Sequence, residues 1–145
     1  MLSKLRNQDG LAILEMALIM PLILVFLMLI VDAGLLFFNG VSATNAVREG
    51  ARCAVVGHTE TAIQDRVTEA STMGDPTTVT IEAFEEDGTP IPTWTDATVG
   101  DDLVVTATYD HPWILPVDTI VDGITTFTRT ARMRVEVTSF DDPVC

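Results

Sequence analysis

The sequence is poor in the side chains that carry most enzyme chemistry. Its 145 residues include two histidines, His58 and His111, and two cysteines, Cys53 and Cys145, and neither type forms the closely spaced pair typical of zinc sites. No G-x-x-x-x-G-K-[ST] phosphate loop occurs, and no serine lies in a nucleophile elbow. We therefore expect a protein that is not an enzyme and that has no cofactor or metal.

Basic residues are also scarce. Eight Lys and Arg residues stand against 21 Asp and Glu residues, which gives a net charge of −13. Residues 1–56 sum to zero, so the whole excess lies in residues 57–145. Because an acidic domain repels phosphate groups, we expect no nucleic acid partner.

Part of this negative charge lies in short clusters, Glu85-Glu86-Asp87, Asp101-Asp102 and Asp141-Asp142. Carboxylate oxygens are calcium ligands, and calcium takes about six to eight of them. No EF-hand spacing is present. We interpret the clusters as solvated turns, with calcium binding as the alternative.

Apolar residues, in contrast, are concentrated near the N-terminus. Residues 16–31 contain no charge, and the apolar segment covers residues 11–38. Its length of about 28 residues exceeds the roughly 20 that a helix needs to span a bilayer. Lys4 and Arg6 precede it, so the positive-inside rule places the leader in the cytoplasm and the C-terminal domain outside. We predict a single-pass protein of the cytoplasmic membrane, in contact with the lipid bilayer.

This segment differs from a cleaved secretory signal peptide. The leader, residues 1–10, ends in Gly10, a carboxylate follows at Glu15, and Pro21 interrupts the apolar run. The run is too long for a signal peptide, and no small-residue cleavage site follows it. Because Pro21 removes one helix hydrogen bond, we expect a helix kink there.

Glu15 needs a partner, because a carboxylate at the edge of a membrane helix is costly. A cut after Gly10 would give Leu11 a free α-ammonium group about one helical turn from Glu15, in the same or a neighbouring subunit. Alternatively, Glu15 lies among the headgroups as part of an uncut anchor. The spacing favours the cut.

The motif Gly10-LAILE resembles the prepilin processing site of type IV pilins and pseudopilins, and residues 10–56 resemble TadE-like minor pseudopilins of the tight-adherence (Tad/Flp) pilus system. The resemblance implies a prepilin peptidase that cuts between Gly10 and Leu11, with Glu15 as the assembly carboxylate and Pro21 as the helix break. It also implies other pilin or pseudopilin subunits and a pilus assembly platform as partners, in adhesion or secretion.

The apolar segment continues into the outer domain as a helix. Small and apolar residues recur at helical spacing up to Val56, on a stripe of Ala43, Val47, Gly50 and Ala54. We therefore expect a leader at residues 1–10, a transmembrane helix at 11–38, its outer continuation at 39–56 and a small α+β domain at 57–145. A second short helix is expected at residues 62–71, with Thr59 or Thr61 as its cap.

Strand patterns occur at residues 78–84, 103–109 and 126–139. The last places Phe127, Ala131, Met133, Val135 and Val137 on one face. Residues 91–100 indicate a loop or a short extra strand, and Pro112 and Pro116 exclude a central strand between them. The fold class is therefore α+β, with a long helix packed on an antiparallel sheet of three or four strands, as in pilins.

Four further side chains have more than one interpretation. Cys53 and Cys145 lie outside the membrane, which favours one intramolecular disulfide; free thiols and bridges between subunits are the alternatives. Trp94 and Trp113 lie in loops beside prolines. Each is either an anchor for a partner or a lid over the small core.

Two functions remain. The first is a minor pseudopilin that is cut after Gly10, packs through its N-terminal helix with other pilin subunits, and enters or supports a surface pilus. The second is an uncut, membrane-anchored extracytoplasmic binding module that never joins a filament.

Overall fold

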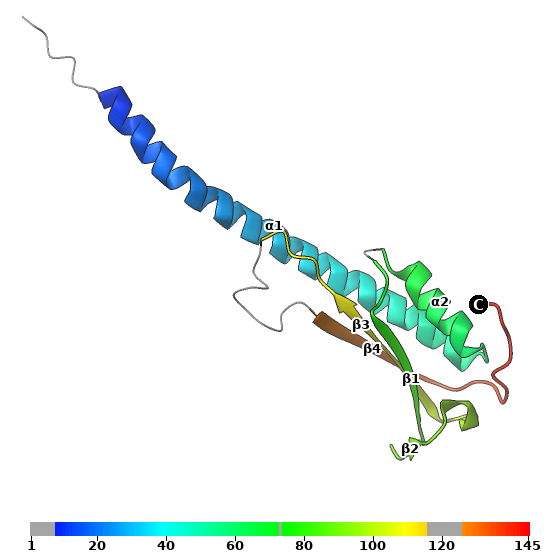
Figure 1. The fold of residues 1–145 in the computed structure, drawn as a ribbon. Helices are drawn as coiled ribbons and strands as arrows, with labels where there is room; N and C mark the ends of the chain where they lie inside the picture. The colour runs from blue at the N-terminus through cyan, green and yellow to red at the C-terminus, as the bar shows by residue number, and fades with distance from the viewer. Residues whose placement is uncertain (1–7, 73, 116–125) are drawn as a thin grey trace, which may run out of the picture.

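The computed structural model describes residues 8–72, 74–115 and 126–145, and it shows one long helix that carries a small domain along its C-terminal half (Figure 1). The prediction of an α+β fold, with a long apolar helix followed by a small antiparallel sheet, is confirmed. The leader residues Lys4 and Arg6, as well as Pro116, lie outside the described residues.

Helix α1, Gln8–Val55, has 48 residues and is about 72 Å long. It continues without interruption through Pro21 and through Asn39. Residues 11–31 are all exposed, because no other described part of the chain covers them. Among the described residues, α1 is the one helix that is long and apolar enough to cross a membrane.

Helix α2, Glu60–Ala70, packs beside the last turns of α1 (Figure 1). The hydroxyl of its N-cap residue Thr59 accepts a hydrogen bond from the Ala62 N–H at 3.4 Å. Val67 on the inner face of α2 is fully buried. Gly50 of α1 makes this approach possible, because a Cβ at that position would overlap with Val67 Cγ2.

The strands form one antiparallel sheet in the order β2-β1-β3-β4. Their bounds are Thr78–Phe84 for β1, Pro90–Ile91 for β2, Asp102–Asp110 for β3 and Thr126–Arg134 for β4. The first two predicted strands are therefore confirmed. The expected loop or extra strand contains β2 at its start and then a 3-10 turn, Trp94–Asp96.

The prediction for the last strand was wrong at its end, because β4 stops at Arg134 and does not reach Ser139. The N–H of Val135 donates to the carbonyl of Asp101 at 2.8 Å, and the N–H of Glu136 donates to the carbonyl of Val55 at 3.1 Å. After Val135 the backbone thus stops pairing with the residues before β3 and forms a hydrogen bond with the end of α1 instead. The alternation of apolar and polar residues continues past the end of the strand, because Val135 is still buried in the core.

The core lies between the sheet and the C-terminal half of α1. The helix contributes small side chains, which let the sheet approach closely, and β3 contributes Leu103, Val105 and Ala107. The opposite face of the sheet is polar. The hydroxyls of Thr106 and Thr108 form hydrogen bonds with those of Thr130 and Thr128 on β4. One face of the sheet is therefore buried by helices and the other is solvated.

We expect Gly50→Ala to lower the free energy of unfolding of the outer domain by about 1–2 kcal/mol, since overpacking outweighs the gain in helix propensity. Gly34→Ala is the matched control, because nothing lies within 4 Å of a Cβ there. Denaturant unfolding of both variants, followed by circular dichroism, tests the close approach. Equal stability of the two variants would contradict it.

Candidate functional site

The predicted processing residues lie in the first turns of α1. Helix α1 begins at Gln8, so Gly10, Leu11 and Glu15 are all helical and exposed. Glu15 follows Leu11 by four residues, which places the two on one face about one turn apart. Glu15 is exposed, and the ion pairs found among the described residues do not include it.

Pro21 lies within the exposed apolar part of α1. It has no N–H to donate, so the carbonyl of Ala17 one turn earlier lacks its usual helical partner. The helix nevertheless continues on both sides. A kink at Pro21 stays a prediction.

Asp32 is the most unusual charged residue of α1. Its side chain is fully buried although it ends the long uncharged run. One carboxylate oxygen accepts the N–H of Ile114 at 2.9 Å, and the other accepts the N–H of Leu115 at 3.2 Å. Charge-assisted hydrogen bonds of this kind offset the cost of burying a carboxylate.

A second contact holds the same segment to the helix. Asn39, two turns beyond Asp32, donates from Nδ2 to His111 Nδ1 at 2.9 Å, and both side chains are buried. Trp113 packs edge to face on His111, with 4.7 Å between ring centroids. The segment after β3 therefore follows α1 back towards its apolar half (Figure 1).

The role of Asp32 was not predicted from the sequence. Its partners are backbone N–H groups more than 80 residues away, and backbone groups leave no side-chain pattern in a sequence. The available signal was indirect: an acid at the end of an apolar run, and an apolar segment kept out of the sheet by Pro112.

An open groove of about 590 Å³ follows α1 just beyond Asp32. It is lined by Ala33, Leu36, Phe37, Gly40, Val41, Thr44, Asn45, Arg48 and Arg129. Arg129 belongs to β4 and shares the inward face with Phe127 and Ala131, where no charge was expected. It fits because Gly40 has no side chain: a Cβ there would lie 2.9 Å from Arg129 Nη2.

The cysteines lie at the other end of the outer domain. A disulfide joins Cys53 near the end of α1 to Cys145, with 5.8 Å between their Cα atoms. Ligand atoms of Cys53, His58 and Cys145 lie within 4.8 Å of one another. The disulfide uses both sulfurs, so this cluster offers no thiolates to a metal.

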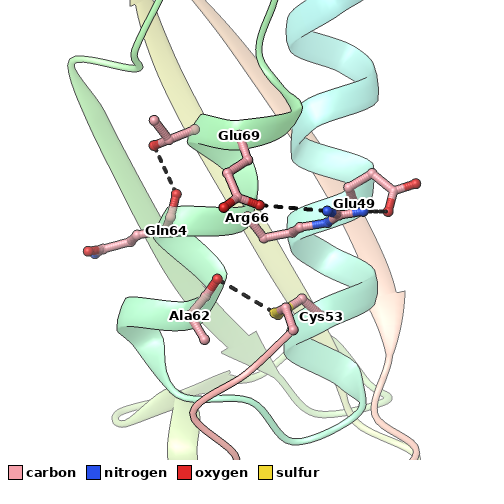
Figure 2. A network of polar contacts seen from close by, with 8 residues as sticks. Glu49, Cys53, Ala62, Gln64, Arg66 and Glu69 are labelled. Carbon is pink, nitrogen blue, oxygen red and sulfur yellow. Dashed lines mark hydrogen bonds and ion pairs between the residues drawn. A yellow bond between two sulfur atoms is a disulfide. The ribbon is translucent and has the colours of Figure 1, made fainter.

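An ion-pair network holds α2 to α1 beside the disulfide. Figure 2 shows Arg66 of α2 between Glu49 of α1 and Glu69, with N–O distances of 3.3 Å and 3.8 Å. All three side chains are partly exposed, so each pair contributes little by itself. The network orients α2 without building a reactive site.

The acidic clusters bind arginines and close turns. Asp102 accepts a hydrogen bond from Arg132 Nε at 2.9 Å, and Glu86 pairs with Arg134 at 3.4 Å. Asp87 accepts the N–H of Thr89 at 2.9 Å, and hydrogen bonding from Thr89 lowers the pKa of the exposed Asp87 carboxyl. These contacts agree with the interpretation of the clusters as solvated turns.

The two tryptophans lie at different places. Trp94 packs edge to face on Phe140, with 5.2 Å between centroids, and covers the core. This is the arrangement expected of a lid. Trp113 instead lies on the segment that is bound to α1.

Tyr109, the single tyrosine of the chain, lies near the end of β3, just before the segment 111–115 that follows α1. It stacks on Phe127 at 5.5 Å between centroids, and burial raises the pKa of its phenol above the usual 10.0. Since the folded-state pKa is raised, the associated stability is present below about pH 10 and is lost as the pH rises through the folded value.

We expect ultraviolet titration of the phenol in the folded protein to give a midpoint above pH 10. The free energy of unfolding should fall between that pH and the midpoint, and Tyr109→Phe should remove this fall. A midpoint at or below 10 would contradict the burial of Tyr109.

The similarity of this chain to known proteins lies in α1. Residues 10–52 match the family model described as TadE-like protein. No curated protein and no solved structure matches the chain. The matched region covers nearly all of α1, including Gly10, Glu15 and Asp32, so the similarity to the TadE-like family lies in this helix.

Proposed function

We propose that this protein is a minor pseudopilin of a tight-adherence pilus, cut between Gly10 and Leu11 and assembled through α1 with other pilin or pseudopilin subunits. The observation that carries the proposal is the match of residues 10–52 to the TadE-like family on a helix whose residues 11–31 are exposed. Before assembly, lipid covers this apolar surface. In a filament or its assembly platform, helices of other subunits replace the lipid.

Glu15 supplies the register of this packing. Once a prepilin peptidase has removed the leader, Leu11 carries a positive charge in an otherwise apolar surface. An interhelical polar contact contributes about 1–2 kcal/mol in model membrane peptides, and it is satisfied at one vertical offset between neighbouring helices. The carboxylate and the new α-ammonium group thus select one alignment of subunits.

The groove beside Gly40 gives a second place for a neighbouring helix. Ala33 lines it on α1, and nothing lies within 4 Å of a Cβ at the next residue, Gly34. Small residues allow helix backbones to approach closely. Arg48 and Arg129 line the groove, so a neighbour that presents an acidic side chain at this level fits best.

The first test is the mass and N-terminal sequence of the protein recovered from a membrane that contains its native peptidase. We expect a chain that begins at Leu11. A chain that keeps residues 1–10 would instead support the membrane-anchored binding module, because Glu15 would then have no α-ammonium partner.

The second test is Glu15→Ala. Loss of a contact worth about 1–2 kcal/mol should reduce incorporation into pili about tenfold while membrane insertion stays normal. Quantitative immunoblots of sheared pili and of membranes measure both. Glu60→Ala, which removes an exposed acid on α2, is the control, and equal incorporation of the two variants would contradict the role of Glu15.

A further inference from the structure

We propose that the outer domain has its own contact with the bilayer, formed by Trp113, Ile114 and Leu115 of the segment after β3 together with Phe37 and Phe38 of α1. We call these five residues the membrane collar. The partner is the outer leaflet of the membrane that α1 crosses. The proposal needs α1 to be inserted, but it does not depend on cleavage after Gly10.

The level of the collar follows from the length of the apolar run. Residues 11–31 span about 31 Å of helix, which matches the roughly 30 Å of a hydrocarbon core. Asp32 then lies at the outer boundary of that core. Because the N–H groups of Ile114 and Leu115 donate to its carboxylate at 2.9 Å and 3.2 Å, their backbone lies at the same level.

The collar continues the exposed apolar surface of α1. Ile114 is 54% exposed, Phe37 76% and Phe38 52%, whereas the apolar side chains between helix and sheet are buried. Phe37 and Phe38 lie about 8–9 Å beyond Asp32 along the helix axis, within the interfacial zone of a bilayer. Tryptophan in this zone is typical of membrane proteins.

The charge distribution also fits a membrane at this end. Segment 111–115 contains no acid or base except His111, which is buried against Asn39. The acidic clusters lie at the opposite end of the sheet, next to the β1–β2 turn and the C-terminus (Figure 1). The acidic clusters therefore lie away from the lipid, while the single acids Asp75 and Asp110 lie beside Asn39 and Tyr109, near the collar.

Asp32 explains how the collar is kept at this level. A free carboxylate at the hydrocarbon boundary would draw water or tilt the helix. Here its oxygens are occupied by two backbone donors of the collar, so the charge is satisfied only while the segment stays at the membrane surface. Asp32 is thus a positioning residue for the collar.

The two tryptophans provide a matched pair for the test, because Trp113 lies in the collar and Trp94 lies at the far end of the domain on Phe140. The full chain is inserted into phosphatidylcholine vesicles whose acyl chains carry bromine near the headgroup. Trp94→Phe leaves Trp113 as the emitter, and Trp113→Phe leaves Trp94. Flotation and resistance to carbonate extraction establish insertion separately.

We expect about twofold quenching of Trp113, as for an indole in the interfacial belt, and almost none of Trp94. Quenching of Trp113 as weak as that of Trp94, in a chain shown to be inserted, would overturn the proposal. If Trp113 is unquenched and a second copy crosslinks to Trp113 or Ile114, this surface binds protein and the proposal also fails.

A second pair of variants tests the collar without changing a tryptophan. Ile114→Gln and Val99→Gln each replace an exposed aliphatic side chain, 54% and 58% exposed, at opposite ends of the domain. In the Trp94→Phe background, Ile114→Gln should reduce the quenching of Trp113, and Val99→Gln should leave it unchanged. Equal effects would contradict a lipid contact at Ile114.

Discussion

The buried carboxylate of Asp32 is the constraint that sets where the segment after β3 lies on α1. It requires two donors at the outer end of the apolar run, and the chain supplies them from Ile114 and Leu115. To reach that point, the segment after β3 has to return along α1, where Asn39 and His111 hold it. Beyond the end of β3, the segment 111–115 therefore continues along the helix.

The two halves of helix α1 have different surroundings, although the helix is continuous. Its first half is apolar and exposed on all sides, which suits lipid or the helices of other subunits. Its second half is dominated by small side chains and buries them against the sheet and α2. Gly50 permits the approach of α2, and the disulfide from Cys53 to Cys145 ties the C-terminus to the end of the helix. The small domain thus packs along the second half of α1 and leaves the first half exposed.

Much of this fold was predictable, because hydrophobic periodicity encodes it directly. The long apolar run, the strand at residues 78–84 and the central strand all follow from local patterns that tertiary contacts did not override. The end of β4 was not predictable, since the alternation continues past Arg134 while hydrogen bonding transfers to Val55. Arg129 faces inward because Gly40 leaves space on another element, and Asp32 binds backbone donors from a distant segment. Neither arrangement has a signature in the local sequence.

The most direct test of this account is amide hydrogen exchange of the full chain in lipid nanodiscs, with Asp32→Ala and the near-isosteric Asp32→Asn. In the unmodified protein, the N–H groups of Ile114 and Leu115 should exchange slowly although they lie outside the sheet. Asp32→Ala should make both amides exchange faster, and Asp32→Asn should have a smaller effect of the same kind. The amides of β3 should stay protected in both variants. If Ile114 and Leu115 exchange equally fast with and without the carboxylate, then Asp32 does not hold the outer domain to the membrane end of α1.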